Sequence, residues 1–348
     1  MRTQSKSAWS TVAPAAGAGF VVLVLATQLL ASTVFVSSDG LGDYPDIQAA
    51  IDAVPDSSTV YLLQGTYTGY GNRGVVLSGK NVSLLVFGPP GSAVIDCQGG
   101  DRALEVGAGV DSTSVIDGIT FRNGNARSGS GGAVYCESGG PKILNCSFAD
   151  NSATYGGALR SNGEPAPIVR GCVFTGNSGV YGGAIDAREV AIRVENSTFT
   201  GNSASRGGAM NFFDSSPTIS NCTMCMNSAD FGAAVKLDQS SALIVRCIVA
   251  LNRTNEALYG EESSETSYSC VFGNADGDEV DGNAHHNSTV DPLLCDAEGG
   301  DYHLCSNSYC LPSGNPWSVH IGHQAQGCAS CMSPVSEMSW GALKARYR

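Results

Sequence analysis

Charged residues are scarce in this chain, and positive ones are the scarcest. They make up 15% of the 348 residues, against about 25% in a typical globular domain. The 19 Lys and Arg face 32 Asp and Glu, which gives a net charge of −13. This much negative charge repels phosphate backbones and excludes nucleic acid as the partner. We expect a partner that is neutral, cationic or bridged by cations.

Apolar runs long enough to span a membrane are also lacking. The apolar segment at 20–30 covers 11 residues, whereas a bilayer requires about 20. It follows Arg2 and Lys6 and precedes small residues, an arrangement typical of a secretory signal. We therefore predict a signal peptide at 1–31. The mature chain should have no transmembrane segment and should be secreted, extracellular or held at the cell surface.

Glycine, by contrast, is abundant at 44 residues, and much of it recurs at a fixed interval. Four near-copies begin at Asn145, Gly171, Asn196 and Asn221, at intervals of 26, 25 and 25 residues. Each contains three short β-type runs separated by Asn or Gly turns, without the apolar spacing of helical repeats. The sequence thus predicts an all-β fold, a right-handed parallel β-helix with coils of about 25 residues and three short strands per coil.

Equivalent positions of successive coils lie about 4.8 Å apart in such a solenoid, so each repeated position forms a column. One predicted column is apolar and points inward, and a second is a ladder of Asn side chains that satisfies the buried turns. The apolar column contains Phe148, Phe174, Phe199, Met224 and Val249, and the ladder contains Asn151, Asn177, Asn202, Asn227 and Asn252.

Thirteen cysteines are consistent with an oxidising compartment. Five of them form a third column, and the spacing leaves two outcomes open. They either remain buried thiols, acting as small hydrophobes, or form one or two disulfides. The five are Cys146, Cys172, Cys222, Cys247 and Cys270.

Both ends of a solenoid need caps. We place the β-helix at 34–284, including an N-terminal capping helix at 45–54 that Pro55 ends. A Cys/His-rich C-terminal cap follows at 285–333 and a basic tail at 334–348. The cap is either stapled by disulfides or organised around zinc. Its Cys and His residues are Cys295, Cys305, Cys310, Cys328, Cys331, His285, His286, His303, His320 and His323.

Two resemblances accompany these patterns. The paired Gly-Gly-Ala and Phe-x-x-Asn signals, as at Gly156 and Phe148, resemble the repeats of chlamydial polymorphic outer membrane proteins. That resemblance implies a surface protein used in adhesion. The segment 43–69, DYPDIQAAIDAVPDSSTVYLLQGTYTG, is similar to the opening of pectinesterases and pectate-lyase-like β-helix proteins. This second resemblance implies an enzyme that acts on carbohydrate.

Catalytic motifs of those enzymes are missing, and no His lies in the repeats. Acidic and Arg side chains are scattered over the coils, and we expect the acids not to stack into one column. We therefore assign no catalytic, cofactor-binding or metal-binding residue, although calcium or zinc would be the ions to consider. The scattered residues are Asp150, Asp186, Glu195, Asp214, Asp230, Asp238, Arg160, Arg170, Arg188 and Arg193.

The sequence therefore predicts a secreted or surface-associated, monomeric protein without enzymatic activity. It would bind a surface protein or a glycan along its faces. The alternative is a polysaccharide-active enzyme, pectate lyase-like or pectinesterase-like, acting on an acidic glycan.

Overall fold

The computed structural model describes residues 30–126, 129–260, 264–280 and 283–331. The predicted signal peptide, apart from its last two residues, and the predicted basic tail lie outside these residues. Among the described residues, no helix has the length and apolar character needed to cross a membrane.

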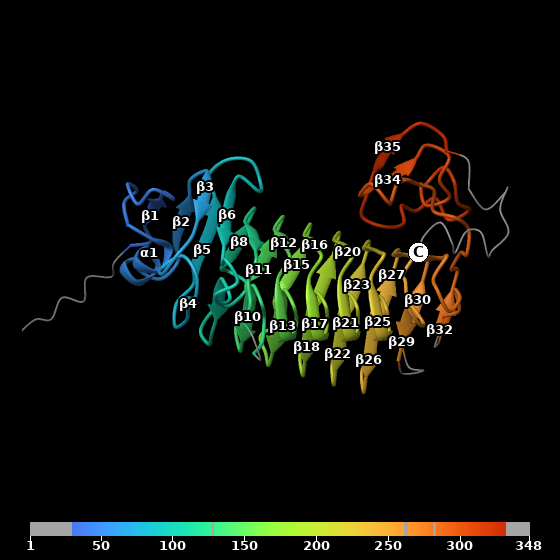
Figure 1. The fold of residues 1–348 in the computed structure, drawn as a ribbon, viewed down its shortest axis with the longest axis horizontal. Coiled ribbons are helices and arrows are strands. Elements are labelled where there is room, and N and C mark those ends of the chain that lie inside the picture. The colour runs from blue at the N-terminus through green and yellow to red at the C-terminus, as the bar shows by residue number, and fades with distance from the viewer. Residues whose placement is uncertain (1–29, 127–128, 261–263, 281–282, 332–348) are drawn as a thin grey trace, which may run out of the picture. The chain divides into compact units, whose positions relative to one another are not determined.

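The predicted right-handed parallel β-helix is confirmed, and its strands stack in register from coil to coil (Figure 1). Each coil passes first through sheet I and then through sheet II. Sheet I contains β1 (Thr33–Val36), β2 (Ser58–Leu62), β5 (Val82–Val86), β8 (Val115–Asp117), β11 (Lys142–Leu144), β15 (Ile168–Arg170), β19 (Arg193–Glu195), β23 (Thr218–Ser220), β27 (Leu243–Val245), β30 (Glu265–Ser267) and β32 (Asn283–His285). Sheet II contains β3 (Gly65–Tyr67), β6 (Ala93–Asp96), β9 (Thr120–Arg122), β12 (Ser147–Ala149), β16 (Val173–Thr175), β20 (Thr198–Thr200), β24 (Thr223–Cys225), β28 (Ile248–Ala250) and β31 (Cys270–Phe272).

The central coils contain a fourth strand, which the sequence had not indicated. It follows the Asn turn and precedes a Gly-Gly pair, or Gly-Ala after the last copy. The four copies form sheet III, with β13 (Ser152–Tyr155), β17 (Ser178–Tyr181), β21 (Ser203–Arg206) and β25 (Ser228–Phe231). The coil then closes through sheet IV, with β4 (Val75–Leu77), β7 (Leu104–Val106), β10 (Val134–Glu137), β14 (Leu159–Asn162), β18 (Ile185–Arg188), β22 (Met210–Phe213), β26 (Val235–Asp238) and β29 (Leu258–Tyr259). The strands of sheet III are short because only four residues separate the Asn from the first glycine in each of these coils.

The capping helix predicted at the N-terminus is present as α1, Ile47–Ala53. Asp46 caps it, because the carboxylate accepts a hydrogen bond from the backbone N–H of Ala49 at 2.8 Å. Ile47, Ala50 and Ile51 are buried, so the helix packs its apolar face on the first coils.

The predicted columns fill and hold the interior. Phe148, Phe174 and Phe199 are fully buried and stack face to face, with ring centroids 4.6 and 4.7 Å apart. In the Asn ladder, Asn177 Nδ2 donates to Asn202 Oδ1 at 3.0 Å and to the Phe148 carbonyl at 3.0 Å. The same pattern of hydrogen bonds repeats along the ladder. It provides partners for the polar groups of the turns, which are buried in the coil interior.

The cysteines divide into two groups. The column from Cys146 to Cys270 consists of buried free thiols, as the first of the two alternatives predicted. In the C-terminal cap, Cys295 pairs with Cys328 and Cys305 with Cys331, so this region is stapled by disulfides. The staples join the cap strands β33 (Leu294–Asp296), β34 (Asp301–Cys305) and β35 (Gln326–Cys328).

Candidate active site

Polar side chains form one row along the outer face of sheet IV, hereafter the polar row. Strand register places each residue of the row beside the next, one coil further on. The row consists of Glu105, Tyr135, Arg160, Asp186, Asn211, Lys236 and Tyr259.

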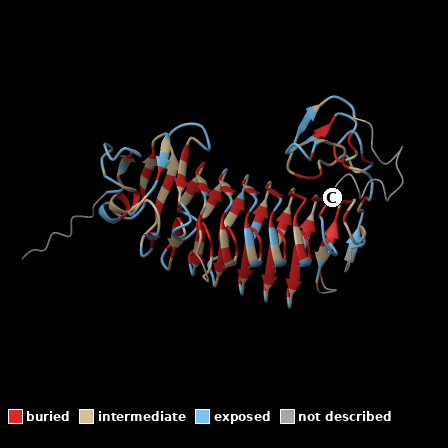
Figure 2. Cartoon of the chain, viewed as in Figure 1, coloured by how far each residue is buried: buried red, intermediate tan, exposed pale blue. Residues whose placement is uncertain are grey.

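The centre of this row is buried, although it points away from the solenoid core. The exposed fractions of Arg160, Asp186 and Asn211 are 7%, 1% and 4%, and that of Lys236 is 4%. Figure 2 accordingly shows β18, β22 and β26 coloured almost entirely as buried. In a strand whose outer face is solvated, buried and exposed residues would alternate. Burial of charged groups is unfavourable unless partners are supplied, so the contacts of these four residues define the site.

The four residues make two sets of contacts, one that joins Arg160, Asp186 and Asn211 and one around Lys236. Arg160 makes an ion pair with Asp186, and Asn211 Nδ2 donates to Asp186 Oδ1 at 2.6 Å. Lys236 Nζ donates to Asp238 Oδ1 at 2.5 Å and to the Leu237 carbonyl at 3.3 Å. Within the described part of the chain, three buried atoms beside this network have no hydrogen-bond partner: Arg160 Nε, Arg188 Nε and Asn211 Oδ1. These buried atoms leave hydrogen-bonding capacity of the site unsatisfied.

Sheet III supplies the cover. Tyr155 and Tyr181 stack with ring centroids 5.1 Å apart, and the Arg160 guanidinium lies 5.0 Å from the Tyr155 ring centroid. Arg206 lies over Tyr181 at 5.6 Å and reaches Asp238 at 3.8 Å. The outer faces of sheets III and IV therefore meet at the corner between them, and cations there rest on aromatic rings.

Two glycines make this corner. Gly156 has a φ of +63°, and a Cβ on Gly157 would lie 2.1 Å from the Gly183 carbonyl oxygen. Only glycine therefore fits this close approach of one coil to the next. The repeated Gly-Gly pair brings Tyr155 at the end of β13 within reach of Arg160 in β14.

Burial changes the proton affinity of the site. It lowers the pKa of Arg160 to about 10, and the nearby Arg188 charge acts in the same direction. Arg160 is still cationic at neutral pH. Within the row, the Arg160 charge is balanced by Asp186, and the Lys236 charge by Asp238.

Four of the residues that the sequence singled out meet here: Arg160, Asp186, Arg188 and Asp238. The expectation concerned the acids alone, and the column partner of Asp186 is a cation, because Arg160 is its register partner on the adjacent strand. Arg170 and Glu195 instead pair with each other on sheet I at 2.8 Å. The remaining scattered residues are exposed and lie outside the row: Asp150, Arg193, Asp214 and Asp230.

Sequence analysis missed Asn211 and Lys236. A signal was available, because every member of the row from Tyr135 to Lys236 stands one residue after the apolar residue that follows the Gly-Gly-Ala or Gly-Ala-Ala motif. That position changes from coil to coil in charge, whereas its neighbours repeat.

The sequence matches no family of known proteins and no curated protein. Among solved structures, it is similar to pectate lyase Pel9A, at 13% identity over 85% of this chain and 96% of that one, with a TM-score of 0.48. It is also similar to a mannuronic acid-specific family 6 polysaccharide lyase from human gut microbiota, at 13% identity over 74% and 83% of the two chains, with a TM-score of 0.37. A family 6 alginate lyase, AlyGC, is 10% identical over 88% and 58%, with a TM-score of 0.26.

These findings correct the functional prediction. We expected a non-enzymatic adhesion protein, whereas the solved proteins that this chain is similar to are polysaccharide lyases. At such identities the similarity concerns the fold alone.

Proposed function

We propose that this chain is an enzyme acting on an acidic polysaccharide and that the polar row is its active site. The observation that carries the proposal is the burial of Arg160, Asp186, Asn211 and Lys236 side by side on the outer face of four consecutive coils. Apolar side chains in this row would give equal or greater stability, because a buried ion pair rarely exceeds a hydrophobic replacement. We therefore attribute the buried charges to a catalytic role.

The substrate class follows from the sign of the charge. Arg160, Arg188, Arg206 and Lys236 gather at one corner of a protein whose net charge is −13. Guanidinium groups match the geometry of carboxylates, so uronate units are the groups we expect there. Successive coils lie about 4.8 Å apart, and Arg160 and Lys236 stand three coils from each other in the row, with Asp186 and Asn211 between them.

We assign the proton transfer to Lys236. Both cations are ion-paired, Arg160 with Asp186 and Lys236 with Asp238, but an amine releases a proton and takes it back far more readily than a guanidinium does. Lys236 would remove the proton from the carbon next to the uronate carboxylate. A carbon–carbon double bond then forms, the bond to the leaving sugar oxygen breaks, and a proton is delivered to that oxygen. The Arg side chains would stabilise the negative charge that develops on the carboxylate.

We also propose that the enzyme is exported. The signal-type segment supports this, as do the two disulfides of the cap, because disulfides persist in oxidising compartments.

The test is incubation of the purified protein with pectins, alginates and other acidic glycans, with and without calcium. Unsaturated products and new reducing ends are expected together. Lys236→Met should lower turnover about 100-fold or more, the usual contribution of a general base. The matched control is Lys142→Met on sheet I, which should retain activity. Turnover that survives Lys236→Met, or silence across the panel, would refute the proposal, and methanol release without unsaturated products would indicate an esterase.

A further inference from the structure

The C-terminal cap turns back onto the outer face of sheet II. Gln324 Nε2 donates to Thr198 Oγ1 at 3.0 Å, and the backbone N–H of His323 donates to Thr223 Oγ1 at 3.1 Å. Tyr302 and Thr200 share a hydroxyl hydrogen bond. The cap covers β24 completely, since all three of its residues are buried, but leaves Thr175 of β16 exposed.

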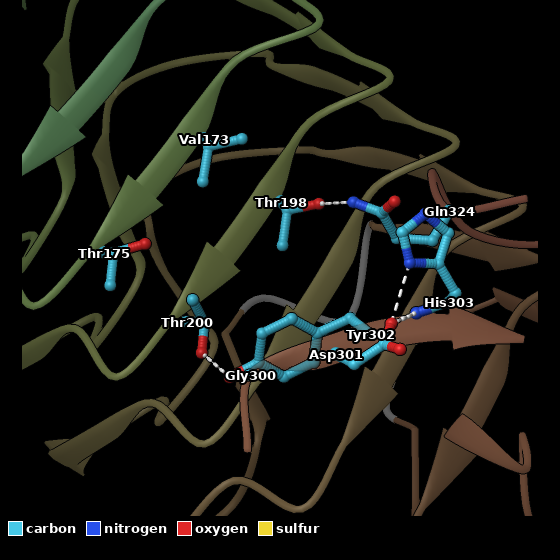
Figure 3. A pocket seen from close by; sticks show the side chains of 9 residues that line it. All are labelled: Val173, Thr175, Thr198, Thr200, Gly300, Asp301, Tyr302, His303 and Gln324. Carbon is cyan, nitrogen blue, oxygen red and sulfur yellow. Dashed lines mark hydrogen bonds and ion pairs between the residues drawn. The ribbon is translucent and has the colours of Figure 1, made fainter. Parts of the chain in front are cut away.

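A pocket of about 470 Å³ lies where this cover ends (Figure 3). Its volume is within the roughly 300–1,000 Å³ of small-ligand sites. β16 and β20 form one side of it, and the cap forms the other. The lining residues are Val173, Thr175, Thr198, Thr200, Gly300, Asp301, Tyr302, His303 and Gln324.

Hydrogen-bonding groups in this pocket are neutral or already paired. The Asp301 carboxylate accepts from the His303 backbone N–H at 3.0 Å and contacts His303 Nδ1 at 2.7 Å. His303 Nε2, Thr175 Oγ1 and Gln324 Oε1 have no partner among the described residues, so they are available to a ligand. Val173 and the Tyr302 ring add apolar surface.

We infer that this pocket binds a neutral sugar unit. Hydroxyl, amide and imidazole groups around a small apolar surface match a pyranose, which has hydroxyls at its edge and C–H bonds on its faces. No Lys or Arg is among the described lining residues, and Asp301 disfavours a second carboxylate. The pocket therefore suits a different sugar from the polar row, and it is built from different sheets of the same coils.

The experiment is a titration of the full chain with the methyl glycosides of glucose, galactose and mannose, and with methyl galacturonate, followed by ligand-observed NMR. At least one neutral glycoside should saturate, with methyl galacturonate bound more weakly. Thr175→Val and Gln324→Ala should each weaken binding by about tenfold, the loss of one or two hydrogen bonds. Thr175 is exposed, so its substitution should leave folding intact.

The matched control is Thr66→Val, an exposed threonine on β3 of the same sheet, which should bind like the unaltered protein. Lys236→Met should also bind normally, which separates this pocket from the proposed active site. The inference is wrong if no neutral glycoside saturates, if the uronate binds equally well, or if both pocket variants retain full affinity.

Discussion

Asn211 donates a hydrogen bond of 2.6 Å to the Asp186 carboxylate, one coil away on sheet IV. Asp186 in turn pairs with Arg160 on the coil before it, so one network links three coils. The groups that we propose for substrate binding thus also hold neighbouring coils together. Substitutions can separate the two roles.

Removal of Arg160 alone should be costly. Arg160→Met leaves the Asp186 carboxylate buried beside Asn211 without a cation, and we expect the free energy of unfolding to fall by about 3–5 kcal/mol. The double variant Arg160→Met with Asp186→Asn should recover most of that loss, because no charge remains buried. Urea unfolding of both measures the difference. Equal losses in the two variants would show that the ion pair is not what the fold depends on.

Truncation of one rung of the Asn ladder should weaken the solenoid. Asn202→Ala leaves the Phe174 carbonyl and the Asn177 N–H without their partners. Each buried group left unsatisfied costs about 1–3 kcal/mol, so a fall of several kcal/mol is expected. Thermal unfolding provides the measurement, and Ser203→Ala, at the exposed neighbouring position, is the control. A ladder variant that melts with the control would contradict this prediction.

The buried thiols should be inert in the folded protein. Nine cysteines are free and buried, and burial raises the pKa of Cys136 to about 12, which suppresses its reactive thiolate. We expect essentially no reaction with a disulfide reagent at pH 8, and nine equivalents after denaturation without reductant. A count of seven or five would instead reveal one or two disulfides within the Cys column.

Acidification should loosen the cap. Burial lowers the pKa of His323, and the charges of His320 and His303 add to the effect. The folded protein therefore binds fewer protons than the unfolded chain once pH falls below about 6.5, and stability decreases in that direction. Hydrogen exchange of the cap between pH 8 and pH 5 should show increased opening, which His323→Gln reduces. His285→Gln, at an exposed position, should behave like the unaltered protein.

The sequence by itself determined the repeat, and with it the fold. A column of a solenoid is set by one spacing, so the stacking of Phe148 on Phe174 and the bonding of Asn177 to Asn202 follow from residues about 25 apart. The corner at Asn145 also follows, since its φ of +49° is one that Asn tolerates. Arg160 and Asp186 occupy equivalent positions of successive repeats, so their adjacency could have been predicted by the same argument.

Only the tertiary structure decided which face became a site. The polar row is buried because the Gly156–Gly157 corner places Tyr155 over Arg160. The repeat length of the sequence does not determine the angle between two sheets, so this burial could not be predicted from it. The contacts of the C-terminal cap could not be predicted from the sequence for a similar reason. Gln324 meets Thr198 across 126 residues, and Cys305 finds Cys331 rather than Cys328. The cap lacks a repeat, so these contacts depend on how its irregular chain packs against the coils.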